Sequence, residues 1–437
     1  MTNAMATDSP PTPAPRNLIV CFDGTSNEFG KENTNVVRLV QSLVRDPERQ
    51  LVYYDPGIGT LPEPGLFTGI GKKLSEMAGL AFGAGLNGKI TGGYRYLMEN
   101  WRPGDKVYIF GFSRGAYTAR ALAALLHLFG LLPPGSQNLL PYLMRKFMSS
   151  SREYKAGGVR GASKPGVEPD GPYKDFCAAW RDVFARDVPG QAERRLPVHF
   201  LGVWDTVKSV GWVWEPLSLP FTAFNPGVSV VRHAIAVDER RAFFRQNRFT
   251  PGPAEFKQDL VERWFPGVHA DVGGGYPLEQ GSLWRVAFCW MAEQAHAHGL
   301  AIDPQRLDQA IRSMPAKRSA TESGLPPRSV DAVLADAAEL RAWVEPAHES
   351  LTPTWWPAEV FPKMVAERVQ IGGAWIWRNR PRLNRGAYRH VPEGAALDVS
   401  VIQRICELAD YRPRHARAAA FPETDAGNSA RLKVSTG

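Results

Sequence analysis

A serine between a strand and a helix is the residue in this sequence best placed to act as a nucleophile. Residues 107–120 read VYIFGFSRGAYTAR, so an apolar strand enters the pattern GxSxG at Gly111, Ser113 and Gly115, and an alanine-rich helix follows. Glycine is needed at both flanking positions because the strand and helix backbones nearly touch at such a turn. The order strand, serine, helix predicts a nucleophile elbow, which lifts a hydroxyl to the end of a strand.

A serine hydroxyl needs a base that accepts its proton and an acid that orients the base. Among the nine histidines of the chain, His269 alone follows an apolar strand and begins a glycine-rich loop, in WFPGVHADVGGGY, ahead of the last core helix. Such a loop allows an imidazole to reach back over the sheet. We therefore expect His269 to be the base. The alternative is a surface histidine in a loop whose glycines serve only the turn.

Two aspartates compete for the role of the acid, because each follows a predicted strand between the serine and the histidine. Asp205 follows VHFLGVW, and its largely apolar surroundings would protect a buried hydrogen bond. Asp238 follows HAIAV and lies in DERR, whose charges favour a salt-bridged helix start. We favour Asp205 and keep Asp238 as the alternative acid, and the residue without the role would be a helix cap or a surface ion pair.

The oxyanion that forms when a serine attacks a carbonyl group needs two N–H donors that are already in place. The backbone N–H of Arg114, directly after the serine, is expected to be one of them. The second is expected at Gly24 or Thr25, because their turn follows a buried strand at the carboxyl edge of the sheet, where sites form in open α/β folds. Asp23 is expected to brace this turn by accepting its N–H groups, and a plain turn is the alternative.

The elements that would hold these residues alternate between strand and helix. Apolar stretches typical of buried parallel strands lie at 18–22, 51–54, 107–110, 198–204, 234–237 and 264–268, and amphipathic or apolar helices are expected at 35–44, 90–100 and 283–297. This alternation predicts an α/β fold with a mostly parallel central sheet flanked by helices and right-handed crossovers. The order is the one expected of an α/β-hydrolase, in which the serine, the acid and the histidine follow one another along the chain.

The chain of 437 residues is expected to hold one large catalytic domain with additions. Residues 1–16 lack the basic start and the apolar run of a signal peptide and are predicted to be a disordered leader. The catalytic domain is expected over 17–300, with a helical insertion or cap at 133–195. Residues 301–437 are predicted to be a C-terminal extension packed on the catalytic domain, and an independent domain is the alternative.

Charge and cysteine content narrow the choice of partners and compartment. The net charge is +8, but Lys and Arg are spread along the chain without a dense basic run, so no nucleic acid partner is expected. The four cysteines are far apart and predict neither a disulfide framework nor a zinc ribbon, which favours synthesis in a reducing cytoplasm. No stretch is apolar and long enough to span a bilayer. The glycine-rich, amphipathic stretch 65–90 is interpreted as a mobile flap or a surface for peripheral membrane contact, or else as a core helix.

Two motifs for cofactor or phosphate binding fail on closer reading. Gly83, Gly85 and Gly88 spell GxGxxG, but a helical segment precedes them where a dinucleotide site needs a strand. The segment GLFTGIGKK has Lys73 where a phosphate loop needs Ser or Thr for magnesium. We therefore expect no cofactor, and the predicted reaction requires no metal.

Six motifs together resemble a known family. They are, in chain order, CFDGTSN, YYDPGIGT, GFSRGAYTAR, VWDTV, AVDERR and WFPGVHADVGGGY, and they span about residues 17–300. They are similar to those of an uncharacterised bacterial and fungal α/β-hydrolase domain that includes phospholipase effectors of type VI secretion systems, of the first lipase class. The resemblance implies cleavage of acyl esters of glycerophospholipids by a triad on Ser113, Asp205 and His269.

The same resemblance implies a lipid or acyl-ester substrate, export through a type VI system without a cleaved signal peptide, and a secretion apparatus or an immunity protein as partners. The segment GAALDVSVIQRI also resembles the end of the family's sequences, but Asp398 stands where a histidine would be expected. This departure puts the contribution of the tail in doubt and leaves the triad assignment intact if His269 is the base.

Two further functions remain open. Asp23, Gly24 and Thr25 resemble the DxDGT motif of haloacid-dehalogenase phosphatases, whose nucleophilic aspartate would fall at Cys21. The absence of an aspartate at that position argues strongly against a phosphatase. Magnesium-dependent turnover of phosphate esters would favour that phosphate-ester hydrolase. The other is an inactive hydrolase fold that acts as a binding module at a membrane or on a secretion partner. Vesicle binding without hydrolysis would favour this binding module.

Overall fold

The computed structural model of the protein describes most of the chain and leaves out several segments. The described residues are 14–24, 33–57, 69–156, 171–207, 211–212, 215–216, 219–250, 252, 256, 258–313, 328–359, 363–371 and 374–413. Side chains are described for these residues except at 69–84, 151–156, 211–212, 215–216, 354, 357–358 and 363–382. Thr25 and nearly all of the predicted leader lie outside the described residues.

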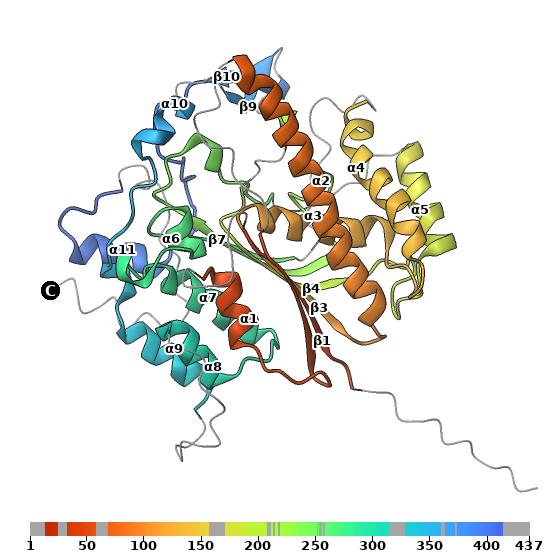
Figure 1. Ribbon diagram of the computed structural model, residues 1–437, viewed down its shortest axis with the longest axis horizontal. Coiled ribbons are helices and arrows are strands. Elements are labelled where there is room, and N and C mark those ends of the chain that lie inside the picture. Colours follow the sequence, from red (N-terminus) through yellow and green to blue (C-terminus); the bar gives the residue numbers. More distant parts are fainter. Residues whose placement is uncertain are drawn as a thin grey trace, which may run out of the picture.

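Six parallel strands form the central sheet (Figure 1). Their spatial order is β2-β1-β3-β4-β7-β8, and their bounds are β1 (Asn17–Phe22), β2 (Gln50–Asp55), β3 (Lys106–Phe112), β4 (Val198–Trp204), β7 (Val228–Ala236) and β8 (Asp259–Phe265). Helices cover both faces of this sheet. The predicted α/β class with a parallel central sheet is therefore confirmed.

Two strands begin earlier than their apolar stretches predicted. β7 starts at Val228 rather than at residue 234, and β8 starts at Asp259 rather than at residue 264 and ends at Phe265. Polar residues inside β7 interrupt the apolar pattern, because Arg232 and His233 are buried there. Each has an acidic partner on β8, since Arg232 pairs with Asp259 at 2.7 Å and His233 with Glu262 at 2.9 Å. These acidic partners satisfy the two polar side chains and so allow them to be buried.

Alternate residues of β1 supply the two halves of the core. Leu18, Val20 and Phe22 pack with α2 (Gly69–Asn100), α3 (Arg114–Phe129), α4 (Leu140–Ala156) and α5 (Pro172–Phe184). Ile19 and Cys21 pack on the opposite face with α1 (Asn35–Ser42), α7 (Trp284–Ala297), α8 (Pro304–Arg312) and α9 (Val330–Glu339). This alternation is what a strand buried on both faces requires, because successive side chains point to opposite sides.

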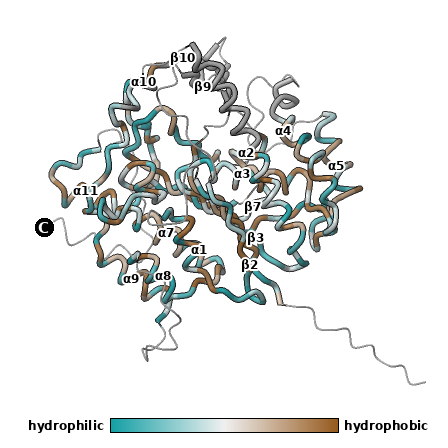
Figure 2. The backbone as a smooth tube through the Cα atoms, in the orientation of Figure 1, coloured by the Kyte–Doolittle hydropathy of each residue, from teal (hydrophilic) through white to brown (hydrophobic). Residues whose placement is uncertain are grey.

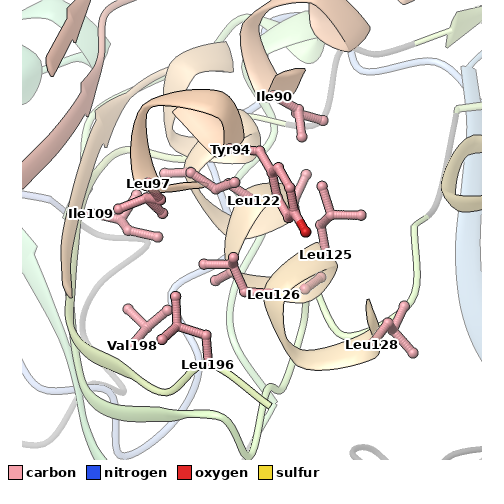
Figure 3. Packing of buried hydrophobic residues seen from close by; sticks show 14 of the residues in the cluster. Ile90, Tyr94, Leu97, Ile109, Leu122, Leu125, Leu126, Leu128, Leu196 and Val198 are labelled. Carbon is pink, nitrogen blue, oxygen red and sulfur yellow. The ribbon is translucent and has the colours of Figure 1, made fainter. Parts of the chain in front are cut away.

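The core around α3 is built mainly from aliphatic side chains (Figure 3). Ile90, Tyr94 and Leu97 of α2 pack against Leu122 and its neighbours on α3. Figure 2, in which the backbone is coloured by hydropathy, shows hydrophobic residues along the strands and helices in the centre of the molecule. Tyr94 donates its hydroxyl proton to the carbonyl of Gly130 at 3.0 Å and accepts the backbone N–H of Leu132 at 2.9 Å, so this buried hydroxyl is satisfied. Of the predicted stretch 65–90, residues 69–90 belong to the helix α2, and residues 65–68 lie outside the described residues. Leu86 and Ile90 of this stretch are buried in the core.

The described part of the insertion packs against the far end of α3. It comprises a 3₁₀ turn (Gln137–Leu139), α4 and α5, and Phe129 at the end of α3 contacts Phe147 and Trp180 edge-on. Phe129 is 16 residues from Ser113 along the chain, which corresponds to about 24 Å of helix. A role of 133–195 as a cap over the serine stays a prediction, and residues 157–170 of it lie outside the described residues.

The chain after residue 301 returns to the sheet at strand β8. Leu397 forms a parallel bridge with Trp264, and α11 (Val399–Glu407) packs there through Val401 in a small apolar cluster. Asp398 caps α11 by accepting the backbone N–H of Ser400 at 3.0 Å. The remaining short elements are β5 (Gly211–Trp212), β6 (Glu215–Pro216), α6 (His269–Gly273), α10 (Trp356–Glu359), the hairpin β9 (Lys363–Ile371) with β10 (Ala374–Arg382), and 3₁₀ turns at Ala242–Phe244, Leu278–Gln280, Ala342–Val344 and Pro353–Trp355.

Candidate active site

Ser113 occupies a sharp turn between β3 and α3. Its backbone has φ of 59° and ψ of −122°, a conformation that is costly for a residue with a side chain and that clusters at functional sites. The flanking glycines are sterically required. A Cβ atom on Gly111 would lie 2.5 Å from the carbonyl oxygen of Gly115, and a Cβ atom on Gly115 would lie 2.3 Å from that of Phe22. The predicted close approach of strand and helix is thus present at both positions.

The structure brings Ser113, Asp205 and His269 together from the carboxyl ends of three strands. Nε2 of His269 lies 2.8 Å from Oγ of Ser113, and Nδ1 lies 2.5 Å from Oδ2 of Asp205. His269 starts α6 directly after β8, and Asp205 follows β4 with a positive φ of 38°. These contacts suit the tautomer in which Nδ1–H donates to the carboxylate while Nε2 accepts the serine hydroxyl proton.

Burial and charge favour a neutral imidazole beside an ionised carboxylate. Burial lowers the pKa of His269, and the hydrogen bond and charge of Asp205 offset part of this effect. Burial alone would raise the pKa of Asp205, but the charge of Arg389 and the hydrogen bond from His269 hold it well below its ordinary value. A general base needs a neutral imidazole that can accept a proton, and a carboxylate next to it stabilises the imidazolium that forms.

Asp238, the alternative acid, has other partners. Its Oδ2 accepts the backbone N–H of Gly267 at 2.7 Å and the hydroxyl of Tyr411 at 2.9 Å. Burial raises its pKa to about 6. The segment after it does not begin a helix as its charges suggested, because Glu239 turns inward and only a 3₁₀ turn follows at Ala242–Phe244. Asp238 therefore braces the turn that precedes His269.

The turn after β1 lies directly against the elbow. Asp23 is buried, and its carboxylate accepts the N–H of Gly24 at 2.6 Å and the hydroxyls of Thr34 and Tyr54 at 2.8 Å each. This is the bracing role expected of Asp23. The N–H of Gly24, a candidate oxyanion donor, points to Asp23 in this arrangement. The other candidate of this turn, Thr25, lies outside the described residues.

Arg114 begins α3, so its backbone N–H belongs to the first turn of a helix. The N–H groups of a first turn point out along the helix axis and carry the positive end of the helix dipole. This position is the one expected of an oxyanion donor next to a nucleophile. Its side chain is buried, and burial lowers the pKa of its guanidinium to about 10.

Arg389 contacts Asp205, and the sequence did not reveal this contact. Its Nη1 and Nη2 lie 2.5 Å and 2.9 Å from the two carboxylate oxygens of Asp205, and the side chain is buried. Its Nε donates to the carbonyl of Phe244 at 3.0 Å. No local signal marks this arginine, because it lies in the segment GAYRHVPEG, 184 residues after its partner.

A second carboxylate, Glu239, lies behind the histidine, and the sequence did not reveal this either. Its Oε2 accepts the backbone N–H of His269 at 3.2 Å, its Oε1 accepts the hydroxyl of Ser350 at 2.8 Å, and Arg241 pairs with it at 2.9 Å. Burial alone would raise the pKa of Glu239, but its hydrogen bond and ion pair with Arg241 lower it to about 2. A carboxylate that is ionised at neutral pH therefore holds the start of α6.

Two further histidines support the loops of the site. His233 accepts the backbone N–H of Thr206 through Nε2 at 3.2 Å while its Nδ1 pairs with Glu262, so it holds the residue after Asp205. His348 pairs with Asp271 at 2.6 Å and thereby contacts α6, the short helix that His269 begins. Neither contacts Ser113 in the structure. The sequence gives no signal for either contact.

Cys21, where a phosphatase would carry its nucleophilic aspartate, is a buried strand residue, and burial raises the pKa of its thiol strongly. Within the described residues, no group of three or more His, Cys, Asp or Glu side chains is arranged to hold a metal ion. In the same residues, no helix combines the length and apolar character that a membrane crossing needs.

Comparison with known proteins identifies a family for more than half of the chain. A family model described as the catalytic domain of Tle1-like phospholipase effectors of the type VI secretion system matches residues 16–294. The "Uncharacterized protein YEL023C" of Saccharomyces cerevisiae is 31% identical over 245 residues, which cover 54% of this chain and 33% of that protein. The chain thus spans about a third of the length of this curated relative.

Two solved structures are similar at low overall scores. An uncharacterised protein from Pseudomonas aeruginosa has 18% identity and a TM-score of 0.36, with 75% of this chain and 53% of that chain covered. A Tle1 effector bound to the VgrG spike of a type VI secretion system has 19% identity and a TM-score of 0.32, with 63% of this chain and 55% of that chain covered. The chain matches about half the length of each.

Proposed function

Because residues 16–294 place this chain in the family of Tle1-like type VI secretion phospholipase effectors, through their catalytic domain, we propose that it is a serine hydrolase that cleaves acyl esters of phospholipids. The observation that carries the proposal is the hydrogen-bonded chain from Ser113 through His269 to Asp205, at 2.8 Å and 2.5 Å. Nucleophile, base and acid at these distances are the arrangement that ester hydrolysis through an acyl-enzyme requires.

In the proposed reaction, Oγ of Ser113 attacks the acyl carbonyl carbon while Nε2 of His269 takes the hydroxyl proton. Asp205 holds Nδ1–H and stabilises the imidazolium that forms. The oxyanion accepts the N–H of Arg114 and a second N–H from Gly24 or Thr25. Gly24 serves only if its N–H leaves Asp23. The imidazolium then protonates the leaving alcohol, and water deacylates the enzyme by the same proton path in reverse.

Aromatic side chains next to the base support an apolar acyl group as the part of the substrate that is bound. The rings of Phe112 and Phe244 each lie with their centroids 4.7 Å from that of His269. Phe244 in turn contacts Trp355 of the C-terminal extension at 5.7 Å. We propose a phospholipid as the substrate on this basis and on the family's description, with contact to a membrane surface during turnover. Export through a type VI apparatus and binding to its components are proposed from the family alone.

The test compares the protein with Ser113→Ala on short-chain nitrophenyl esters and on phospholipid vesicles. We expect Ser113→Ala to lose at least about 10⁴-fold in kcat, because no other group supplies the nucleophile. Ser42→Ala is the matched control, since Ser42 is also buried but its hydroxyl bonds only the carbonyl of Arg38 within α1. It should keep its activity within a few-fold.

Equal activity of Ser113→Ala and the unaltered protein would remove the nucleophile assignment. Magnesium-dependent release of phosphate that Ser113→Ala retains would indicate the phosphate-ester hydrolase instead. Vesicle binding by both proteins without release of fatty acid would indicate the binding module.

A further inference from the structure

We propose that Arg389 of the C-terminal extension is a positioning residue of the active site, which orients Asp205 toward His269 and sets the lower pH limit of the reaction. The proposal rests on the proposed function of the Ser113, His269, Asp205 group. It extends the active site beyond the residues 16–294 that the family's catalytic domain covers. The segment around Arg389 then belongs to the catalytic centre rather than to an accessory tail.

The geometry around Asp205 leaves little freedom for another arrangement. Oδ1 accepts the backbone N–H of Ala236 at 2.9 Å and Nη1 of Arg389 at 2.5 Å, while Oδ2 accepts Nδ1 of His269 at 2.5 Å and Nη2 of Arg389 at 2.9 Å. Asp205 is 0% exposed. The flat guanidinium engages both oxygens at once and so fixes the plane of the carboxylate, which decides where Oδ2 meets the imidazole.

Arg389 is itself fixed by the catalytic domain. Besides Asp205, its guanidinium donates to the carbonyls of Phe244 and Ala236, and its backbone N–H donates to the carbonyl of Glu239 at 3.2 Å. Lys has a single ammonium group with no fork, so it cannot replace these contacts together. The same surroundings explain why the charge is tolerated when buried, because a carboxylate and several carbonyls compensate it.

The charge of Arg389 opposes protonation of the Asp205–His269 pair. Removing a positive charge next to a buried pair raises the proton affinity of the pair as a whole. The other charged or titratable groups that face the pair are Glu239 behind the backbone of His269, with its partner Arg241, and His233 beside Thr206. The reaction needs His269 in its neutral form. If the pair binds its proton more tightly, His269 becomes protonated at a less acidic pH, so activity is lost earlier as the pH is lowered.

The experiment measures kcat and kcat/KM against pH for Arg389→Met, Arg389→Lys and Arg404→Met on a short-chain ester. Arg404 is the matched control, because it is also a buried arginine of the extension and also donates to carbonyls, those of Trp343 and Glu345, but it does not contact Asp205. We expect Arg389→Met to lower kcat at least about 30-fold. In its pH–rate profile, the acid limb, where activity falls as the pH is lowered, should move to higher pH by about one unit or more.

Arg389→Lys keeps the positive charge but loses the pair of nitrogens that bind both carboxylate oxygens of Asp205. Its acid limb should stay within about half a pH unit of that of the unaltered protein, while kcat falls at least about 10-fold. Arg404→Met should leave the acid limb in place. An unchanged acid limb and kcat in Arg389→Met, or equal shifts in Arg389→Met and Arg404→Met, would overturn the proposal. If Arg389→Met does not fold, Arg389→Lys decides, because a lysine variant with full kcat would exclude the positioning role.

A measurement without substrate separates this inference from the proposed function. The imidazole signals of His269, assigned by comparison with His269→Gln, are titrated by NMR in the unaltered protein and in the Arg389 variants. We expect the pKa of His269 to rise in Arg389→Met and to change little in Arg404→Met. An inactive protein whose His269 nevertheless shifts in this way would refute the proposed function and keep the role of Arg389. Hydrolysis that depends on Ser113, without a shift in the pKa of His269, would support the proposed function and refute the role of Arg389.

Discussion

The close approach of α3 to β1 can be tested by adding a single methyl group at Gly115. The Cβ atom of Gly115→Ala would lie 2.3 Å from the carbonyl oxygen of Phe22 and 2.5 Å from that of Asp23, whereas real Cβ atoms essentially never come closer than 3.0 Å. The start of α3 and the end of β1 must therefore separate by at least about 0.7 Å. Both obstacles are backbone atoms, so no side-chain rotation relieves the contact.

This displacement acts on the residues that the proposed reaction uses. Ser113 and Arg114 lie on one side of the contact and the turn at Asp23 and Gly24 lies on the other, so Ser113 and the N–H of Arg114 move away together from the second oxyanion donor, which is expected on that turn. A misplacement of about 1 Å costs about 10²-fold in rate, and overpacking costs about 1–3 kcal/mol of stability. We expect kcat of Gly115→Ala to fall by roughly two orders of magnitude, with a smaller change in KM.

The assay is steady-state hydrolysis of a short-chain ester together with thermal unfolding followed by circular dichroism. Gly88→Ala is the matched control, because it makes the same chemical change in α2 at an exposed position where an added Cβ meets nothing within 4 Å. There the substitution should raise stability slightly, by about 0.5–1 kcal/mol, and leave kcat unchanged. Wild-type kcat and thermal midpoint in Gly115→Ala would refute the argument that this glycine is needed for steric reasons.

Two predictions concern the competing aspartates. Asp205→Asn should lower kcat about 10⁴-fold, because it disturbs the tautomer of His269, whereas Asp238→Asn should keep kcat within about 10-fold; the reverse ranking in esterase assays would reassign the acid. Asp238 also predicts a stability effect, because its pKa is raised from 3.8 to about 6 in the folded state. A folded carboxyl with a raised pKa binds its proton more tightly than the unfolded chain does, so its contribution to stability falls as the pH rises from about 4 to about 6, by up to about 3 kcal/mol. Urea unfolding across this range should show the fall in the unaltered protein relative to Asp238→Asn, and parallel curves for the two proteins would contradict it.

The parts of the site that the sequence predicted are those that local pattern determines. GxSxG after an apolar strand predicted the position of Ser113, and the apolar strand ahead of His269 predicted the position of the imidazole, because a strand end and the turn after it are encoded by adjacent residues. His269 begins the short helix α6, however, and not the glycine-rich loop that its sequence predicted. The choice of Asp205 over Asp238 followed from flanking residues, and in the structure Asp205 is the one that contacts His269. The strands β1, β2 and β4 were predicted nearly to their ends because each is a short apolar run.

The parts that the sequence did not reveal depend on contacts between distant segments. Arg389, Glu239 and Ser350 are polar residues in stretches without periodic apolar pattern, and their burial depends on how the extension packs against β7 and β8. The early start of β7 was hidden for a related reason. Arg232 and His233 look like surface residues until β8 supplies Asp259 and Glu262 beside them. A single sequence contains no local signal for such pairing.

The all-parallel arrangement of the six strands has a consequence for how the chain reaches its native state. No neighbouring pair in this sheet is a hairpin, and β1 meets β3 through the register of Asn17 with Lys106, which closes a loop of 89 residues. Closing such a loop costs chain entropy before the strands form stabilising contacts, so folding is slow. Until the strands pair, their apolar edges remain accessible to other chains. We therefore expect spontaneous refolding from denaturant to take seconds or longer and its yield to fall as protein concentration rises. This protein would then depend on chaperones during its synthesis more than a helical bundle of equal length would.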